Sequence, residues 1–347
     1  MRRYIPLLLS GLCILFMVLA TLLYTTQNVD KKEQTNNFVP VTKVLTVYTT
    51  IPVEMASIIA NEYQKDTHVQ INFTILTKDE LLERCRQNDS ENVDMILTDS
   101  MVLDELGNMD KLASNISEEE DIVSEQFKDS KNKWIGIWYD PIVFCYNLDY
   151  VKNNWQIPLT WNELAQQQNI KIAMTDFVAA SAASNVLYSL SEDKNPDNAL
   201  NIMTQIHPKV VRYAKYLSTP VRMTGMGESD VAIAVQSEVI RYINDNYPLS
   251  IIYPKDGTAY QLTAVGICKN SQQIAQSRDF AKWLLSDDVQ MGLQKNRYYY
   301  VPTNYTSLTY KKFAGKNIKF LQKNNIIDEN TQKNILDRWI TEVRLNN

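Results

Sequence analysis

Hydroxyl and small polar side chains stand at four places where a predicted strand passes into a predicted helix. These junctions are Thr49-Thr50, Asp99-Ser100, Ser181–Ser184 and Gln236-Ser237. The start of a helix presents free N–H groups and the positive end of the helix dipole, so such junctions readily hold a phosphate, a carboxylate or another oxyanion. Ordinary helix capping by Ser, Thr or Asp explains each junction taken alone. Because four junctions carry the same chemistry, we predict that together they line a binding cleft.

Catalytic and metal-binding patterns are missing from the sequence. We find no G-x-S-x-G, H-E-x-x-H, G-x-x-x-x-G-K-[ST] or C-x-x-C motif. His68 and His207 are the only histidines, and both stand at predicted turns, so neither a catalytic triad nor a histidine metal site is expected. Tyr298-Tyr299-Tyr300 could bind ferric iron through phenolate oxygens, but such a site needs a carboxylate or an imidazole alongside. We prefer a packed extended segment for these tyrosines, and we predict no enzyme activity, no cofactor and no metal.

The stretch Gly227–Thr258 predicts one wall of the solute site. Its continuous apolar run, Val231–Val235, is typical of a strand that is covered on both faces. Gln236-Ser237 follows at the carboxyl end of that strand, and ligands of open α/β sheets bind outside the carboxyl ends of strands. After a helix, Leu249–Tyr253 supplies the next strand. Tyr139 and Tyr253 could stack on a solute or hydrogen-bond to it, and packing at an interface is the alternative for both.

The elements that must position these residues alternate between strand and helix. Three apolar strands and the helices between them within about sixty residues indicate a parallel, doubly wound sheet. A further apolar run, Ile142–Asn147, is predicted to be a crossover strand that leaves this first region, with a shorter strand, Trp134–Ile137, before it. The three early strands are predicted over Lys43–Tyr48, Val69–Leu76 and Val93–Leu97.

The N-terminus combines Arg2-Arg3 with the twenty-residue apolar run Ile5–Tyr24, which is long enough to span a bilayer. We favour an uncleaved membrane anchor over a cleaved signal peptide for residues 1–27, a flexible linker over 28–42, and an extracytoplasmic location for the rest. The formal net charge of −5 argues against a nucleic-acid partner. Cys85, Cys145 and Cys268 are widely spaced, so we expect no disulfide framework, and Cys145 and Cys268 are predicted to be buried thiols.

Several stretches together resemble the extracellular solute-binding proteins of ABC importers, in the branch that includes ferric-iron-binding proteins and binders of phosphorylated or anionic metabolites. The resemblance spans roughly residues 43–305. Its motifs are LTVYTT at Leu45–Thr50, VDMILTDS at Val93–Ser100, WIGIWYDPIVFCYN at Trp134–Asn147, LTWNELA at Leu159–Ala165, GESDVAIAV at Gly227–Val235, YPKDGT at Tyr253–Thr258, FAKWLLSDDVQ at Phe280–Gln290 and VPTN at Val301–Asn304.

The resemblance implies an α/β fold of two doubly wound lobes, joined by two crossover strands, that close on a ligand like a hinge (the type II periplasmic-binding-protein fold). Lobe 1 would be discontinuous, over residues 43–141 and 255–347, and lobe 2 would be 142–254. The protein would be a monomer that delivers its solute to an ABC permease. A sensor module that signals to a partner such as a histidine kinase is the alternative.

The resemblance also implies a set of ligand contacts. Iron-binding members place a histidine after the first strand, where this chain has Thr50-Ile51, and a carboxylate after the third, where it has Ser100-Met101. These differences favour a small anionic organic solute over ferric iron. The implied contacts are Thr49, Thr50, Ser100, Ser181, Ala182, Ser184, Gln236, Ser237 and Tyr253, with Tyr139 near the hinge.

Overall fold

The computed structural model describes residues 44–87, 92–114, 116, 120–312, 318–321 and 328–346. The predicted anchor, 1–27, and the linker, 28–42, lie outside the described residues. Among the helices that are described, none is long and apolar enough to cross a membrane.

The first half of the sheet begins with three parallel strands, as the sequence predicts. β1 (Val44–Thr49) lies between β2 (Gln70–Ile75) and β3 (Met95–Asp99), and β9 (Tyr260–Ile267) runs antiparallel to β3. The apolar runs of β1 and β3 are almost wholly buried, as strands covered on both faces must be. The helices of this half are α2 (Val53–Thr67), α3 (Lys78–Arg86), α4 (Ser100–Asn108), α11 (Ile274–Leu284), α12 (Asp287–Lys295) and α13 (Leu308–Lys311).

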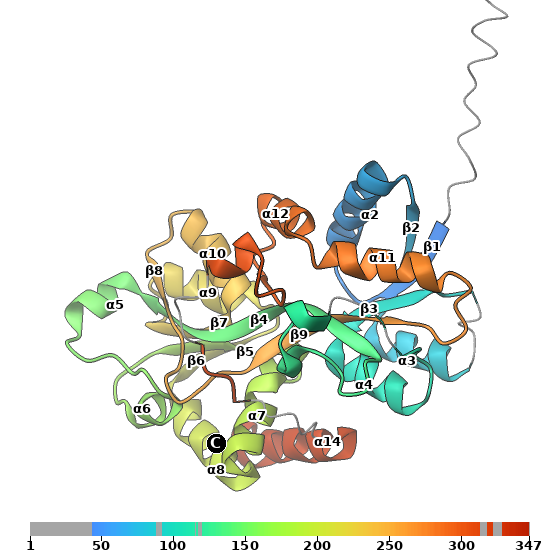
Figure 1. The fold of residues 1–347 in the computed structure, drawn as a ribbon. Coiled ribbons are helices and arrows are strands. Elements are labelled where there is room, and N and C mark those ends of the chain that lie inside the picture. Colours follow the sequence, from blue (N-terminus) through green and yellow to red (C-terminus); the bar gives the residue numbers. More distant parts are fainter. Residues whose placement is uncertain are drawn as a thin grey trace, which may run out of the picture. The chain divides into compact units, whose positions relative to one another are not determined.

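A single long strand, β4 (Trp134–Asn147), belongs to both halves of the sheet (Figure 1). Residues 134–141 pair with β9, and residues 142–146 pair with β7 (Val231–Val235). The sequence predicted two separate strands here, because Pro141 interrupts the run. Pro141 lies where β4 changes partners, so its missing N–H is tolerated there.

The second half of the sheet is built on the carboxyl end of β4. β5 (Ile172–Thr175) lies between β7 and the edge strand β6 (Val210–Ala214), and β8 (Leu249–Ile252) pairs with β4. The strand order is β2-β1-β3-β9-β4-β7-β5-β6, with β8 and β10 (Val301–Pro302) also on β4. The helices of this half are α5 (Leu148–Asn153), α6 (Trp161–Gln166), α7 (Ser181–Lys194), α8 (Pro196–Ile206), α9 (Ser218–Gly225) and α10 (Gln236–Asn244).

Thr160 and Glu163 form the capping box that the sequence predicts at the start of α6. Glu163 N donates to Thr160 Oγ1 over 3.1 Å, and Thr160 N donates to a Glu163 carboxylate oxygen over 3.1 Å. This reciprocal pair fixes where α6 begins.

A second connection between the halves runs beside β4, through residues 253–259. Ile142 N donates to the Ala259 carbonyl over 2.8 Å, and Thr258 Oγ1 donates to the Ile142 carbonyl. Gly257 adopts a φ of +122°, and a Cβ there would lie 2.7 Å from a Leu321 methyl group, so only glycine suits this turn. The two connections therefore cross side by side.

The last helix packs on the second half. Ile335 of α14 (Glu329–Arg338) belongs to the same hydrophobic cluster as Trp161 and Leu187, as do Trp339 and Val343 of the π-helical turn that follows, Trp339–Arg344. The lobe boundaries predicted from the sequence place this segment in lobe 1. The division into lobes stays a prediction.

Free cysteines lie inside both halves. Cys85, Cys145 and Cys268 are buried and unpaired, which confirms the expectation of buried thiols at Cys145 and Cys268. Burial raises the pKa of each thiol.

Candidate functional site

Gln261 of β9 connects two of the predicted junctions. Its Nε2 donates to Asp99 Oδ2 and to Ser181 Oγ, each over 3.3 Å. Asp99 is the N-cap of α4 and accepts from Met101 N over 2.9 Å, so it stands directly before the predicted contact Ser100. The structure therefore brings together the starts of α4 and α7, which belong to different halves of the sheet.

Asp140 of β4 holds a third junction, the start of α10. Ser237 N donates to Asp140 Oδ1 over 2.9 Å, and Ser237 Oγ donates to the other carboxylate oxygen. Asp140 is paired in register with Gln261, so both side chains lie on the same face of the sheet. The starts of α4, α7 and α10 are thus gathered around Asp140 and Gln261.

Sequence reasoning missed these two residues. Each is a polar side chain within an otherwise apolar stretch, Asp140 in WIGIWYDPIVF and Gln261 at the start of QLTAVGIC. Buried polar residues need partners, so the two exceptions were a usable signal. What they contact could not be deduced, because the contacts come from helices far away in the sequence.

Gln236 and Tyr253, both predicted ligand contacts, are hydrogen-bonded to each other through the Tyr253 hydroxyl and Gln236 Oε1. Gln236 is fully buried, and its Nε2 has no hydrogen-bond partner within the described part of the chain. Burial raises the pKa of Tyr253, so its hydroxyl stays protonated and acts as a donor.

At the junction after β1, the hydroxyl groups of Thr49 and Thr50 are already hydrogen-bonded within the protein. Thr49 is fully buried and donates through Oγ1 to the Leu97 carbonyl over 2.6 Å. Thr50 Oγ1 lies 2.7 Å from Thr98 Oγ1. These contacts fit β1 to β3 and account for both side chains without a solute, so their role as ligand contacts stays a prediction.

At the start of α7, Ser181 is the exposed member of the predicted set. Ala182 is buried in the hydrophobic cluster, and Ser184 Oγ donates to the Ser181 carbonyl over 3.0 Å. The helix is preceded by Ala180, which has no side chain able to cap it. Within the described residues, the first N–H groups of this fourteen-residue helix have no side-chain acceptor.

Tyr139 packs against other aromatic side chains, which is the alternative to a contact with solute. Neighbouring residues of a strand face opposite sides, so Tyr139 lies on the face of β4 away from Asp140. Its ring stacks on Phe127 with centroids 4.7 Å apart, and Tyr260 and Phe320 meet it edge-on. A direct contact with solute stays a prediction.

The sequence matches the family model of bacterial extracellular solute-binding proteins over residues 45–298, which is most of the chain. The chain belongs to this family. The resemblance inferred from the sequence is confirmed. The chain is also 23% identical, over 197 residues, to a Haemophilus influenzae protein described only as uncharacterized, and the match covers 55% of this chain and 56% of that relative. This chain therefore spans about half the length of the curated relative that it matches.

Solved structures share the fold of this solute-binding protein at low identity. The periplasmic binding protein AfuA from Actinobacillus pleuropneumoniae, with fructose-6-phosphate bound, has a TM-score of 0.66 at 19% identity, covering 88% of this chain and 100% of that chain. A ferric binding protein from Campylobacter jejuni has 0.66 at 18%, covering 85% and 97%. The substrate binding protein of an ABC transporter from Agrobacterium tumefaciens has 0.67 at 13%, covering 87% and 95%. They establish a periplasmic-binding-protein fold.

The electrostatics of the candidate site distinguish its helix starts. Carboxyl groups already occupy the starts of α4 and α10, through Asp99 and Asp140. Burial raises the pKa of Asp140 to about 7 and also raises that of Asp99. In the described part of the chain no side-chain carboxylate caps the start of α7, so we expect an anion there to meet less repulsion than at the other two helix starts.

The tyrosine run packs against an aromatic side chain of β4. Tyr300 stacks on Trp138 with centroids 6.0 Å apart, and Tyr298 lies 6.3 Å from Tyr300. This is the packed extended segment that we preferred. Within the described ranges, no three His, Cys, Asp or Glu side chains stand close enough to hold a metal ion.

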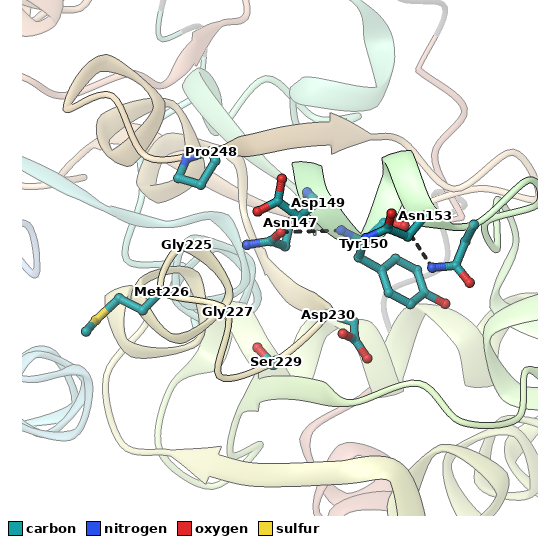
Figure 2. A pocket seen from close by; sticks show the side chains of 11 residues that line it. Asn147, Asp149, Tyr150, Asn153, Gly225, Met226, Gly227, Ser229, Asp230 and Pro248 are labelled. Carbon is teal, nitrogen blue, oxygen red and sulfur yellow. Dashed lines mark hydrogen bonds between the residues drawn. The ribbon is translucent and has the colours of Figure 1, made fainter.

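A hollow of about 370 Å³ opens elsewhere, at the far end of β4, and Figure 2 shows its lining side chains. Asn147, Asp149 and Tyr150 line it from one side, and Ser229 and Asp230 from the other. It contains none of the predicted ligand contacts. Two of the lining side chains are already hydrogen-bonded to a neighbour. Asn147 donates to the Thr224 carbonyl, and the Ser229 hydroxyl is hydrogen-bonded to the Thr224 hydroxyl. We therefore place the candidate site at Gln261 and not here.

Proposed function

We propose that this solute-binding protein serves an ABC importer and captures a small anionic solute between the two halves of its sheet. The observation that carries the proposal is the uncapped start of α7, held 3.3 Å from Gln261 through Ser181 Oγ. Free N–H groups and the helix dipole there suit a phosphate or a carboxylate. A structure of the same fold is bound to fructose-6-phosphate, a solute that carries a phosphate.

Capture would proceed by hinge closure. β4 and residues 253–259 both connect the parts of the sheet that carry α4 and α7, and hinge motions are absorbed by a few such connecting residues. Asp140 and Gln261 lie on or beside these connections, so a solute bound against them would contact both halves. We further propose that the protein acts as a monomer, held at the membrane by residues 1–27, and that it passes the solute to a permease.

Native mass spectrometry of the full-length protein, purified in mild detergent, tests the solute class. We expect a phosphorylated or carboxylated metabolite to co-purify. The same protein is then titrated calorimetrically with inorganic phosphate, fructose 6-phosphate and ferric citrate. Iron without an organic anion in the native mass spectrum would contradict the proposed solute class, and citrate alone is the control for the ferric citrate titration.

Ser181→Asp is expected to weaken binding of the anionic solute by about 100-fold, or about 2.7 kcal/mol. The new carboxylate would place a negative charge where the solute's own charge is held, and like charges a few ångströms apart repel each other. Ser181→Asn has nearly the same shape without the charge and serves as the control. Equal affinities of the two variants would remove α7 from the site.

A further inference from the structure

The π-helical turn Trp339–Arg344 packs behind the segment that leads into α7. Trp339 is 1% exposed, and its ring lies 4.7 Å from that of Phe177 and 5.8 Å from that of Tyr213. Phe177 stands four residues before Ser181. The end of the chain is thus built into the support of the candidate anion site.

Arg344 forms an ion pair with the same segment. Its Nε donates to Asp176 Oδ2 over 3.4 Å, and its guanidinium carbon lies 4.2 Å from the centroid of the Tyr213 ring. Tyr213 is held in turn by its hydroxyl, 2.8 Å from His207 Nδ1. The guanidinium therefore sits between a carboxylate and an aromatic face, an arrangement that suits arginine better than lysine.

Asp176 organises the turn before α7 with its remaining atoms. Its Oδ1 accepts from Val178 N over 3.1 Å, and its carbonyl accepts from Ala179 N over 3.0 Å. Its own N–H donates to the Ala214 carbonyl over 2.9 Å. One carboxylate oxygen thus shapes the turn, while Arg344 fixes the other.

We propose that Arg344 and Trp339 are positioning residues of the solute site, which fix the Asp176 turn and thereby aim the first N–H groups of α7 at the bound anion. The proposal rests on the proposed function, since it assumes that α7 meets the solute. The side chains of Arg344 and Asp176 are 36% and 18% exposed, and ion pairs of that exposure contribute little to overall stability. The affinity of a binding site, in contrast, is sensitive to small displacements of the residues that support it.

Arg344→Gln and Asp176→Asn test the role, with Arg338→Gln as the matched control. Arg338 directly precedes the π-helical turn and also pairs with acids, Asp197 and Glu342, neither of which lies in the turn before α7. We expect Arg344→Gln and Asp176→Asn each to raise the Kd for fructose 6-phosphate, or for inorganic phosphate if that binds more tightly, about tenfold. The melting temperature should stay within a few degrees, and Arg338→Gln should change neither quantity.

Two further measurements separate positioning from general destabilisation. In the ligand-free protein, amide hydrogen exchange over residues 176–184 should accelerate in Arg344→Gln and not in Arg338→Gln. The double variant Arg344→Gln with Asp176→Asn should lose no more affinity than Arg344→Gln alone, because Asp176→Asn removes an ion pair that Arg344→Gln has already removed.

The outcomes also distinguish this proposal from the proposed function. If Ser181→Asp weakens binding while Arg344→Gln does not, the positioning role alone is overturned. If Ser181→Asp leaves the affinity intact, the anion site itself fails and the positioning role fails with it. Unchanged exchange over residues 176–184 in Arg344→Gln overturns the proposal even when neither phosphate probe binds.

Discussion

Trp161→Ala lowers the free energy of unfolding by about 3 to 5 kcal/mol, in the range found for buried tryptophans cut back to alanine. Trp161 is fully buried, and its ring meets that of Phe144 edge-on at 4.9 Å. Its Nε1 donates to the Gly257 carbonyl over 2.9 Å. The substitution therefore opens a cavity and also leaves a buried carbonyl of the second connection without its donor, and each adds to the loss.

Urea unfolding followed by circular dichroism measures this loss, and Trp155→Ala is the matched control. Trp155 is 104% exposed, so its removal should change the free energy of unfolding by no more than about 0.5 kcal/mol. A similar midpoint for the two variants would mean that Trp161 does not tie α6 to the second connection.

The contribution of Asp140 to the free energy of unfolding falls as pH rises from about 4 to about 7. Burial raises the pKa of Asp140 in the folded protein from 3.8 to about 7. Between these values the folded state binds more protons than the unfolded state, so each rise in pH favours unfolding. The contribution is fully lost above about pH 7 and amounts to about 4 kcal/mol.

Asp140→Asn should remove that share of the pH dependence, because the amide oxygen still accepts from Ser237 N but cannot ionise. Unfolding free energies of both proteins at pH 4.5 and pH 7.5 measure the difference. Asp104 contributes a second share, since burial also raises its pKa to about 7, so the variant keeps some slope. Asp149→Asn, at an exposed carboxylate paired with Lys152, is the control and should retain the full slope. Equal slopes in Asp140→Asn and the control would refute the assignment.

Much of the fold is predictable because its central strands are buried on both faces. Such strands need unbroken apolar runs, and Val231–Val235 is such a run that can be recognised in the sequence. The edge strand β6 was not predicted, because Val211 and Arg212 face solvent and no buried run marks it. The continuity of β4 through Pro141 also escaped prediction, because it depends on a change of partners that only the assembled sheet provides.

The site is harder to predict than the fold. Local sequence indicates that Ser181 and Ser237 stand at helix starts. It does not indicate that α4, α7 and α10 meet, because that follows from a strand order in which β3, β9, β4 and β7 are neighbours without being consecutive. Asp140 and Gln261 acquire their contacts only through that order.

The buried thiols make the proposed closure open to direct observation. A thiolate, not a thiol, reacts with maleimide dyes, and burial keeps Cys85, Cys145 and Cys268 both protonated and out of reach. Once Cys13, which lies outside the described residues, is replaced by serine, the folded protein should be nearly silent to such dyes. Gln64→Cys and Asn201→Cys, at exposed positions of α2 and α8, would then carry a donor and an acceptor fluorophore. Energy transfer between the two dyes would follow each capture of solute in single molecules.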